Sequence, residues 1–283
     1  MKFFSIGATF FWVMAAGLAQ PASADSFSDR IGLQLESFNG PMHKNIDSTL
    51  EKVHRLGFKY VELVGDYGLS PEALKAELKS HGLIATSAHF PYAEFRDHPA
   101  ELAAKAKALG LTYAGCPSLP QHEHLDEKGC REAIAIFNHA GEILAAQGIK
   151  FFYHPHGYEF KPHGEGTLFD LLVAQTNPKF VHFQMDIFWI VHAGQDPRKL
   201  LDRYSDRWVS MHLKDMRKGA AIAIDSKTER GNFVPIGQGQ IDMVAALRTA
   251  RRIGISSFFI EDESASPEKE IPQSVQFLRD ANW

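Results

Sequence analysis

The chain of 283 residues is 45% hydrophobic and 23% charged, with a formal net charge of −4 at pH 7. This weak acidity excludes the basic surface that the phosphates of nucleic acids require, so no nucleic-acid partner is expected. Two cysteines, Cys116 and Cys130, exclude a disulfide scaffold and leave two alternatives, one disulfide or two buried thiols.

Residues 1–24 have the pattern of a secretory signal peptide. Lys2 precedes an apolar stretch over 3–18, and the small residues Ala-Ser-Ala end the segment at 22–24. The apolar stretch is shorter than the ~20 residues that span a bilayer, which disfavours an uncleaved membrane anchor. We therefore expect a periplasmic or secreted protein, with residues 25–283 as one domain that has no membrane contact after cleavage.

The remaining chain alternates short apolar runs with longer stretches of helical period. The expected strands are 31–38, 58–64, 83–90, 111–116, 150–156, 180–186, 208–215 and 257–263. The expected helices are 44–56, 71–80, 97–109, 127–147, 166–176, 196–204, 241–252 and 267–280. Glycines that suit left-handed helix caps precede five of the strands, at Gly57, Gly82, Gly110, Gly148 and Gly254.

Eight strand–helix units in about 250 residues predict a closed α/β barrel, the (β/α)8 TIM barrel, rather than an open doubly wound sheet. No GxGxxG turn follows the first strand, which disfavours a dinucleotide-binding fold. The "GQGQ" run at 237–240 is interpreted as a loop because no strand precedes it.

Polar residues recur near the carboxyl ends of the expected strands, where the active site of a TIM barrel lies. Every strand except the fourth contributes at least one of Gln34, Glu36, Glu62, His89, His154, His156, Glu159, Gln184, Asp186, His212, Lys214, Glu261 and Glu263. Several are two residues apart, which places them on one face of a strand. Each alone could be a loop-anchoring residue, and Asp186 could cap the next helix, but their recurrence at one barrel end favours a common site.

So many ionisable groups at one mouth would be costly without a compensating cation. Carboxylates and neutral imidazoles are shared ligands of Zn²⁺, Mn²⁺ and related ions. We therefore expect a divalent metal, which could be Mn, Zn, Co or Mg. The spacing leaves open whether His154 replaces Glu159 among its expected ligands, which are Glu159, Asp186, His212 and Glu261.

Five motifs in this order make the chain resemble the sugar phosphate isomerase/epimerase family, whose members share a xylose isomerase-like barrel: "YHPHGYEF", "FQMDIFWIVHAGQDP", "RWVSMHLKD", "PIGQGQID" and "FFIEDE". The resemblance implies a metal held by a Glu, Asp, His, Glu set at the ends of the fifth to eighth strands. That set falls on Glu159 (or His154), Asp186, His212 and Glu261. The chain departs from the family at His154, where well-studied epimerases end the fifth strand in a ligating Glu.

The family's chemistry implies proton transfer next to a carbonyl. We expect a sugar isomerase or epimerase acting on a non-phosphorylated sugar, keto-sugar or polyol, because no Arg/Lys cluster at the mouth would hold a phosphate. The alternatives are a lyase or dehydratase, for example β-elimination on a 3-keto-glycoside, and a catalytically silent sugar-binding protein. The expected bases are His154, His156 and Lys214. The expected substrate contacts are Glu62, His89, Gln184 and Trp189.

The polar connection 217–235 follows the seventh expected strand and is unusually long. It could fold over the mouth or contact another subunit, and a homo-oligomer is one of the open outcomes.

Overall fold

The computed structural model describes residues 31–283 and, before them, only Met1. The signal peptide expected over residues 1–24 therefore lies outside the described residues, apart from Met1, and stays a prediction together with export. Among the described residues, every helix is too short or too polar to cross a bilayer.

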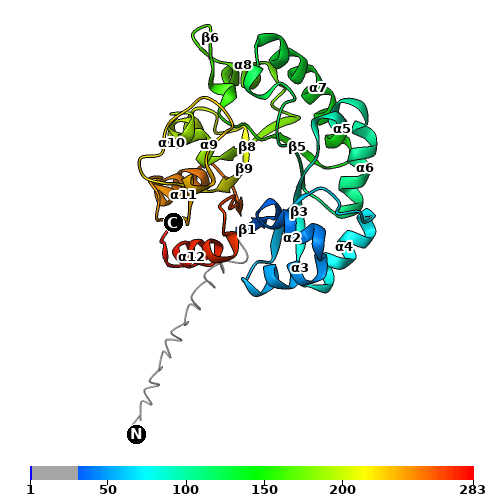
Figure 1. The fold of residues 1–283 in the computed structure, drawn as a ribbon. Coiled ribbons are helices and arrows are strands. Elements are labelled where there is room, and N and C mark those ends of the chain that lie inside the picture. The colour runs from blue at the N-terminus through cyan, green and yellow to red at the C-terminus, as the bar shows by residue number, and fades with distance from the viewer. Residues whose placement is uncertain (2–30) are drawn as a thin grey trace.

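Eight parallel strands close into a barrel in the order β1-β12-β9-β8-β5-β4-β3-β2, as the sequence predicts. The barrel strands are β1 Ile31–Gln34, β2 Tyr60–Val64, β3 Ile84–His89, β4 Tyr113–Cys116, β5 Lys150–Tyr153, β8 Val181–Asp186, β9 Trp208–Leu213 and β12 Ser257–Ile260. Figure 1 shows these strands at the centre of the molecule with the helices around them.

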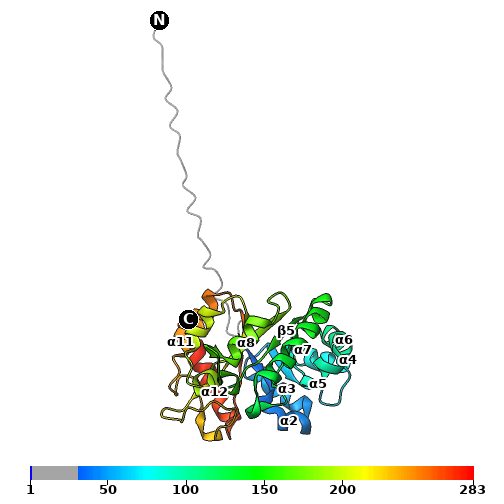
Figure 2. The same ribbon diagram turned by 90° about the horizontal axis from the view of Figure 1, so that it is seen from above.

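The helices cover the outer face of the barrel. They are α2 Asn39–Lys44, α3 Ile46–Arg55, α4 Pro71–Ser80, α5 Tyr92–Asp97, α6 Pro99–Leu109, α7 Glu127–Ala146, α8 Leu168–Gln175, α9 Ile187–His192, α10 Pro197–Arg203, α11 Met243–Arg252 and α12 Pro267–Asp280. The views of Figures 1 and 2 agree in placing α5, α6 and α7 on one flank and α11 and α12 on the opposite one.

Local signals in the sequence explain where these helices begin and end. Ser70 Oγ accepts a hydrogen bond from Ala73 N at 3.2 Å, and Pro71 occupies the first turn of α4. The glycines expected to end helices all have positive φ, at Gly57, Gly82, Gly110, Gly148 and Gly254. The predicted alternation of strand and helix is therefore confirmed down to these caps.

Several strands end earlier than expected, among them the last, which ends at Ile260, and two of these boundaries change the backbone around the site. Residues Leu35–Phe38, expected within the first strand, form the 3-10 helix η1, in which Gln34 accepts a hydrogen bond from the backbone of Glu36. The fifth strand was expected to reach residue 156 but ends at Tyr153. Pro155 lacks the N–H that a further ladder hydrogen bond needs, so the chain turns there into η3 Tyr158–Phe160.

Aromatic rings fill the barrel beneath the polar strand ends. A Cβ at Gly115 would lie 2.1 Å from the Phe152 ring, and one at Gly32 would lie 2.7 Å from the Phe259 ring. Only glycine leaves room for these rings inside the barrel. Phe152 contacts the His89 ring at a centroid distance of 5.6 Å, so an apolar layer closes the barrel below the site. Cys116 and Cys130 are buried free thiols, which decides between the two alternatives for the cysteines.

The long connection after β9 is clamped at its base by a short antiparallel ladder. Strands β10 Asp215–Met216 and β11 Phe233–Val234 pair with each other, and the 3-10 helix η4 Arg230–Asn232 precedes β11. The segment 217–232 between them packs against α9, where Ala223 N donates to His192 O at 2.8 Å. It also reaches the turn after β5, because a Cβ at Gly157 would lie 2.1 Å from Asp225 O.

Candidate active site and metal centre

A layer of polar side chains fills the carboxyl end of the barrel. Each of the following lies within the last three residues of a barrel strand or directly after one and is buried: Gln34, Glu62, His89, His154, Gln184, Asp186, His212, Lys214 and Glu261. Strand register sets this convergence, since parallel pairing places Gln34 beside Glu62 and Asp186 beside His212. The structure thus brings together most of the site residues expected from the sequence.

Gln184 connects three of these side chains. Its Oε1 lies 2.8 Å from His154 Nδ1 and 2.9 Å from His89 Nε2, so both ring nitrogens donate to it. Its amide nitrogen donates to Glu62 Oε1 at 2.9 Å. These partners assign the His154 proton to Nδ1 and leave a lone pair on Nε2. Burial lowers the pKa of both His89 and His154, which favours neutral rings.

His212 lies between two carboxylates. Its Nε2 is 2.5 Å from Glu62 Oε2, and its Nδ1 is 2.6 Å from Glu261 Oε2 but without hydrogen-bonding geometry. Burial opposes charge on the ring, but Glu62 and Glu261 outweigh it and raise the pKa of His212 to about 10. Burial also opposes ionisation of Glu62, yet His89 and His212 lower its pKa to about 2.

The two carboxylate oxygens of Asp186 have different surroundings. Oδ1 accepts hydrogen bonds from Phe188 N and Trp189 N, at 3.0 and 3.2 Å, and so caps α9. Oδ2 is buried without a hydrogen bond and lies 2.9 Å from Lys214 Nζ. The capping role that the sequence allows therefore uses one oxygen and leaves the other facing the polar layer.

Lys214 supplies positive charge to this layer. Its Nζ lies 2.9 Å from Asp186 Oδ2, 2.8 Å from Glu261 Oε2 and 2.5 Å from Glu263 Oε1. Burial alone would lower the pKa of Lys214, but Asp186 and Glu261 raise it well above its ordinary value. These neighbours favour a charged ammonium over the base expected from the sequence, since a base must be unprotonated.

Four ligand-type atoms face one another in a way that fits a divalent cation. One ligand atom each from Asp186, His212 and Glu261 lies within 4.8 Å of the other two, and His212 Nδ1 is 3.8 Å from Asp186 Oδ2. His154 Nε2, which carries a lone pair, is 3.6 Å from Asp186 Oδ2. Buried polar atoms are nearly always satisfied, yet Asp186 Oδ2 and His212 Nδ1 have no hydrogen bond. Two imidazoles and two carboxylates suit Zn²⁺ and similar ions.

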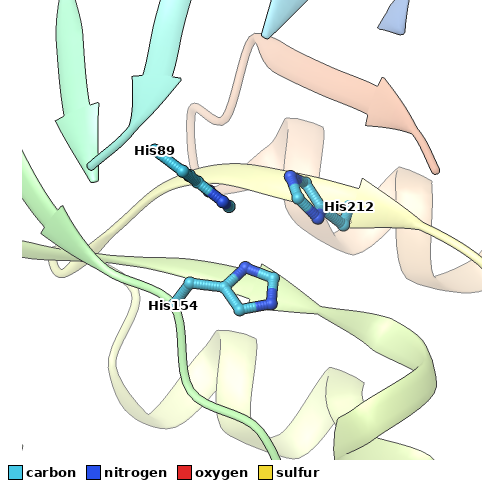
Figure 3. A group of neighbouring side chains, drawn as sticks. All are labelled: His89, His154 and His212. Atoms are coloured by element: carbon cyan, nitrogen blue, oxygen red, sulfur yellow. The ribbon is translucent and has the colours of Figure 1, made fainter. Parts of the chain in front are cut away.

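A second possible ligand group consists of His89, His154 and His212, whose rings point toward one another in Figure 3. Both nitrogens of His89 already have partners. Its Nε2 contacts Gln184, and its Nδ1 lies 3.4 Å from the amide nitrogen of Gln34. The group that contains Asp186 is therefore the better fit for a metal.

Glu159 does not join this cluster. One carboxylate oxygen accepts a short hydrogen bond from Tyr153 OH, and the other accepts one from His156 N at 3.0 Å. Burial raises the pKa of Glu159 to about 7. Its oxygens are used inside the turn after β5, which leaves His154 as the side chain from this turn that faces Asp186.

A cavity of about 290 Å³ opens onto the polar layer. It is lined by Gln34, Glu36, Val64, His89, Pro117, His154, His156, Lys214, Glu261 and Glu263. His156 Nδ1 is buried without a hydrogen bond, and burial, with help from Lys214, lowers the pKa of this ring to about 3. A neutral imidazole with an unpaired nitrogen therefore lines the cavity.

One expected substrate contact lies elsewhere, and one residue of the polar layer was not expected. Trp189 lies on α9, where its ring contacts His156 at 5.5 Å, and it lines a separate larger cavity rather than the inner one. Ser87, which sequence reasoning missed, donates to Glu62 Oε1 at 2.6 Å. Its position two residues before His89 on β3 was the available signal, because that spacing puts both side chains on one face.

Known proteins resemble the chain over most of its length. A family model described as a xylose isomerase-like TIM barrel matches residues 50–281. The inosose dehydratase of Geobacillus kaustophilus is 25% identical over 256 residues, which cover 80% of this chain and 82% of that protein.

Solved structures share the fold. A sugar phosphate isomerase/epimerase from Parabacteroides distasonis has a TM-score of 0.75 at 24% identity and covers 92% of this chain and 97% of that one. An IOLI protein with a bound zinc atom has a TM-score of 0.68 at 17% identity. The match covers 88% of this chain and 97% of the IOLI protein. At these identities, the two structures are evidence for the fold alone.

Proposed function

The chain belongs to the xylose isomerase-like TIM barrel family, and from that premise we propose that it is a divalent-metal-dependent lyase. Its substrate is a non-phosphorylated keto-sugar or keto-polyol, from which it removes water or another group β to the carbonyl. The observation that carries the proposal is the convergence of Asp186, His212 and Glu261 at the barrel mouth, where Asp186 Oδ2 and His212 Nδ1 are buried without hydrogen bonds.

His154, Asp186, His212 and Glu261 are the proposed ligands, with His154 in place of the Glu159 favoured from the sequence. Support comes from the lone pair on His154 Nε2 and from the hydrogen bonds that occupy both oxygens of Glu159. Glu62 accepts from His212 Nε2, so it would orient that ring as carboxylates commonly do for ligating histidines.

When bound, the ion supplies positive charge that stabilises the negative charge developing on the carbonyl oxygen. His156 is the proposed base, because its neutral ring lines the cavity and its Nδ1 has no hydrogen-bond partner. It takes the proton from the carbon next to the carbonyl, and the electron pair of that C–H bond forms the C=C bond. The leaving oxygen departs from the neighbouring carbon with a proton from the imidazolium of His156.

Other polar residues form the cavity wall and supply positive charge beside the carboxylates. Lys214 keeps a fixed positive charge at the cavity wall, and the His89 ring, held by Gln184 and Gln34, forms another part of that wall. The inosose dehydratase name of the Geobacillus kaustophilus relative favours elimination over the isomerase or epimerase reaction that the sequence suggested first. Both reactions begin with the same proton transfer, so the product distinguishes them.

The test is incubation of metal-loaded protein in D₂O with 2-keto-myo-inositol and a panel of 3-keto-glycosides, followed by mass spectrometry and NMR. We expect loss of water or of the aglycone, with His156→Ala slowing the reaction by about 10²-fold or more. Deuterium at carbon in an intact skeleton would instead identify an isomerase or epimerase. A complete lack of exchange and elimination would contradict an enzymatic function of this site on these ketones.

A further inference from the structure

A second, larger cavity of about 790 Å³ lies beside the inner one. Its walls come from three parts of the chain: η1 and α2 after the first strand, the segment 217–232 with Phe233, and the loop between β12 and α12. Trp189 on α9 completes the lining. None of the residues that line this cavity is a proposed metal ligand.

The two cavities meet at Glu36 and Glu263, which line both. Glu263 Oε1 is 2.5 Å from Lys214 Nζ, so this shared wall borders the polar layer directly. The inner cavity of about 290 Å³ is at the small end of ligand pockets, which suits a single sugar ring. A substrate that reacts there can extend past Glu36 and Glu263 into the larger space.

The lining of the larger cavity suits a neutral ligand that is rich in hydroxyl groups. Its charged side chains have both signs, namely Glu36, Asp262 and Glu263 together with Lys227 and Arg230. Such a lining favours neither an anionic nor a cationic group. Asn39 also lines the cavity, and its amide nitrogen donates to Glu36 Oε2 at 3.0 Å.

From this arrangement we infer that the outer cavity is a second sugar subsite and that the substrate is a glycoside of at least two rings. One ring reacts in the inner cavity, and the second, neutral ring lies between Asn39 and Trp189. The inference rests on the proposed function for the identity of the reacting ring, but the outer subsite is measurable by binding alone.

The test uses unreactive sugars without a ketone, so that turnover does not affect the result. Glucose is compared with cellobiose, maltose and sucrose by ligand-observed NMR titration or calorimetry on the full protein. We expect at least one disaccharide to bind about ten-fold or more tightly than glucose, because it fills both cavities.

Two surface glycines give a matched pair of variants. Gly40 lines the outer cavity and Gly231 does not, and a Cβ at either position meets nothing within 4 Å. We expect Gly40→Trp to reduce the ratio of disaccharide to glucose affinity to nearly one and Gly231→Trp to retain it. Equal binding of glucose and all the disaccharides to the wild type, or an undiminished ratio in Gly40→Trp, would overturn the second subsite.

The two proposals fail separately. Elimination from one-ring ketones without any preference for disaccharides would overturn the subsite and leave the lyase standing. A disaccharide preference that Gly40→Trp removes, in a protein that converts none of the ketones, would support the subsite and contradict the lyase.

Discussion

At the scale of single residues, neighbouring charges set the protonation of His212. In the metal-free arrangement, Glu62 and Glu261 raise the pKa of this ring to about 10, against the effect of burial. The ring is therefore protonated at neutral pH, whereas a ligating imidazole must have a free lone pair. Occupation of the site by a cation has to displace that proton.

We predict that binding of Zn²⁺ or Mn²⁺ releases about one proton per ion near neutral pH. Calorimetric titration in buffers of different ionisation enthalpy measures this number directly. The same titration of His212→Ala should show both weaker binding and less proton release. A binding enthalpy that is independent of the buffer would show that His212 does not exchange a proton for the metal.

Glu159 gives a second prediction at this scale. Burial raises its folded-state pKa from the ordinary 4.5 to about 7, so the folded protein binds a proton more tightly than the unfolded chain. The stabilisation from that proton is fully present below about pH 4.5 and is lost as pH rises through about 7. Its loss amounts to roughly 3–4 kcal/mol at most.

Glu159→Gln should remove this part of the pH dependence, and Glu142→Gln on the exposed face of α7 should leave it unchanged. Urea unfolding of the three proteins at about pH 5 and about pH 8 measures the effect. Identical slopes of stability against pH in the wild type and Glu159→Gln would contradict the raised pKa.

Sequence spacing could predict which residues reach the mouth but not their partners. Period-two spacing correctly brought His154, Asp186 and His212 to one end of the barrel. It could not show that Tyr153 and the backbone of His156 engage the oxygens of Glu159, because this depends on how the turn after β5 folds. The pKa of Lys214 likewise depends on carboxylates from other strands.

At the scale of elements, the segment 217–232 closes one side of the site. The β10–β11 ladder holds its ends, and Arg217 adds a hydrogen bond from its NH2 nitrogen to Asn232 Oδ1 at 2.8 Å. Its middle rests on the turn after β5 through the Gly157–Asp225 approach. These contacts hold the segment against α9 and the turn after β5, and its expected role in contacts between subunits stays a prediction.

We predict that Gly157→Val displaces the segment, because a side chain there would overlap Asp225 O. Limited trypsin digestion should cleave at the exposed Lys218 at least about five-fold faster than in the wild type, since local contacts protect the segment. Gly231→Ala is the matched control, as its Cβ meets nothing within 4 Å. Equal cleavage rates for all three proteins would show that the Gly157 contact does not hold the segment.

At the scale of the whole molecule, the barrel follows from signals repeated along the chain. Eight apolar runs, the helices between them and the glycine caps each point to the same βα unit, so an error in one unit would not change the fold. The short helices α2, α5 and α9 were missed because each has only six residues, less than two turns of periodic pattern. The two cavities depend on loop packing, for which a single sequence offers no periodic signal.

The central claim is that the barrel mouth holds a divalent metal through Asp186 and its neighbours. Asp186 and Asp196 form a natural pair for this test, because each caps a helix with Oδ1 and only Asp186 faces the polar layer. Asparagine preserves capping, so Asp186→Asn and Asp196→Asn should both fold.

The decisive measurement is metal content by mass spectrometry after loading with Zn²⁺ or Mn²⁺ and removal of free ion. The account predicts about one ion per chain in the wild type, in Asp196→Asn and in Glu159→Gln, and a nearly complete loss in Asp186→Asn. Wild-type stoichiometry in folded Asp186→Asn, or loss of the ion in Glu159→Gln alone, would contradict it.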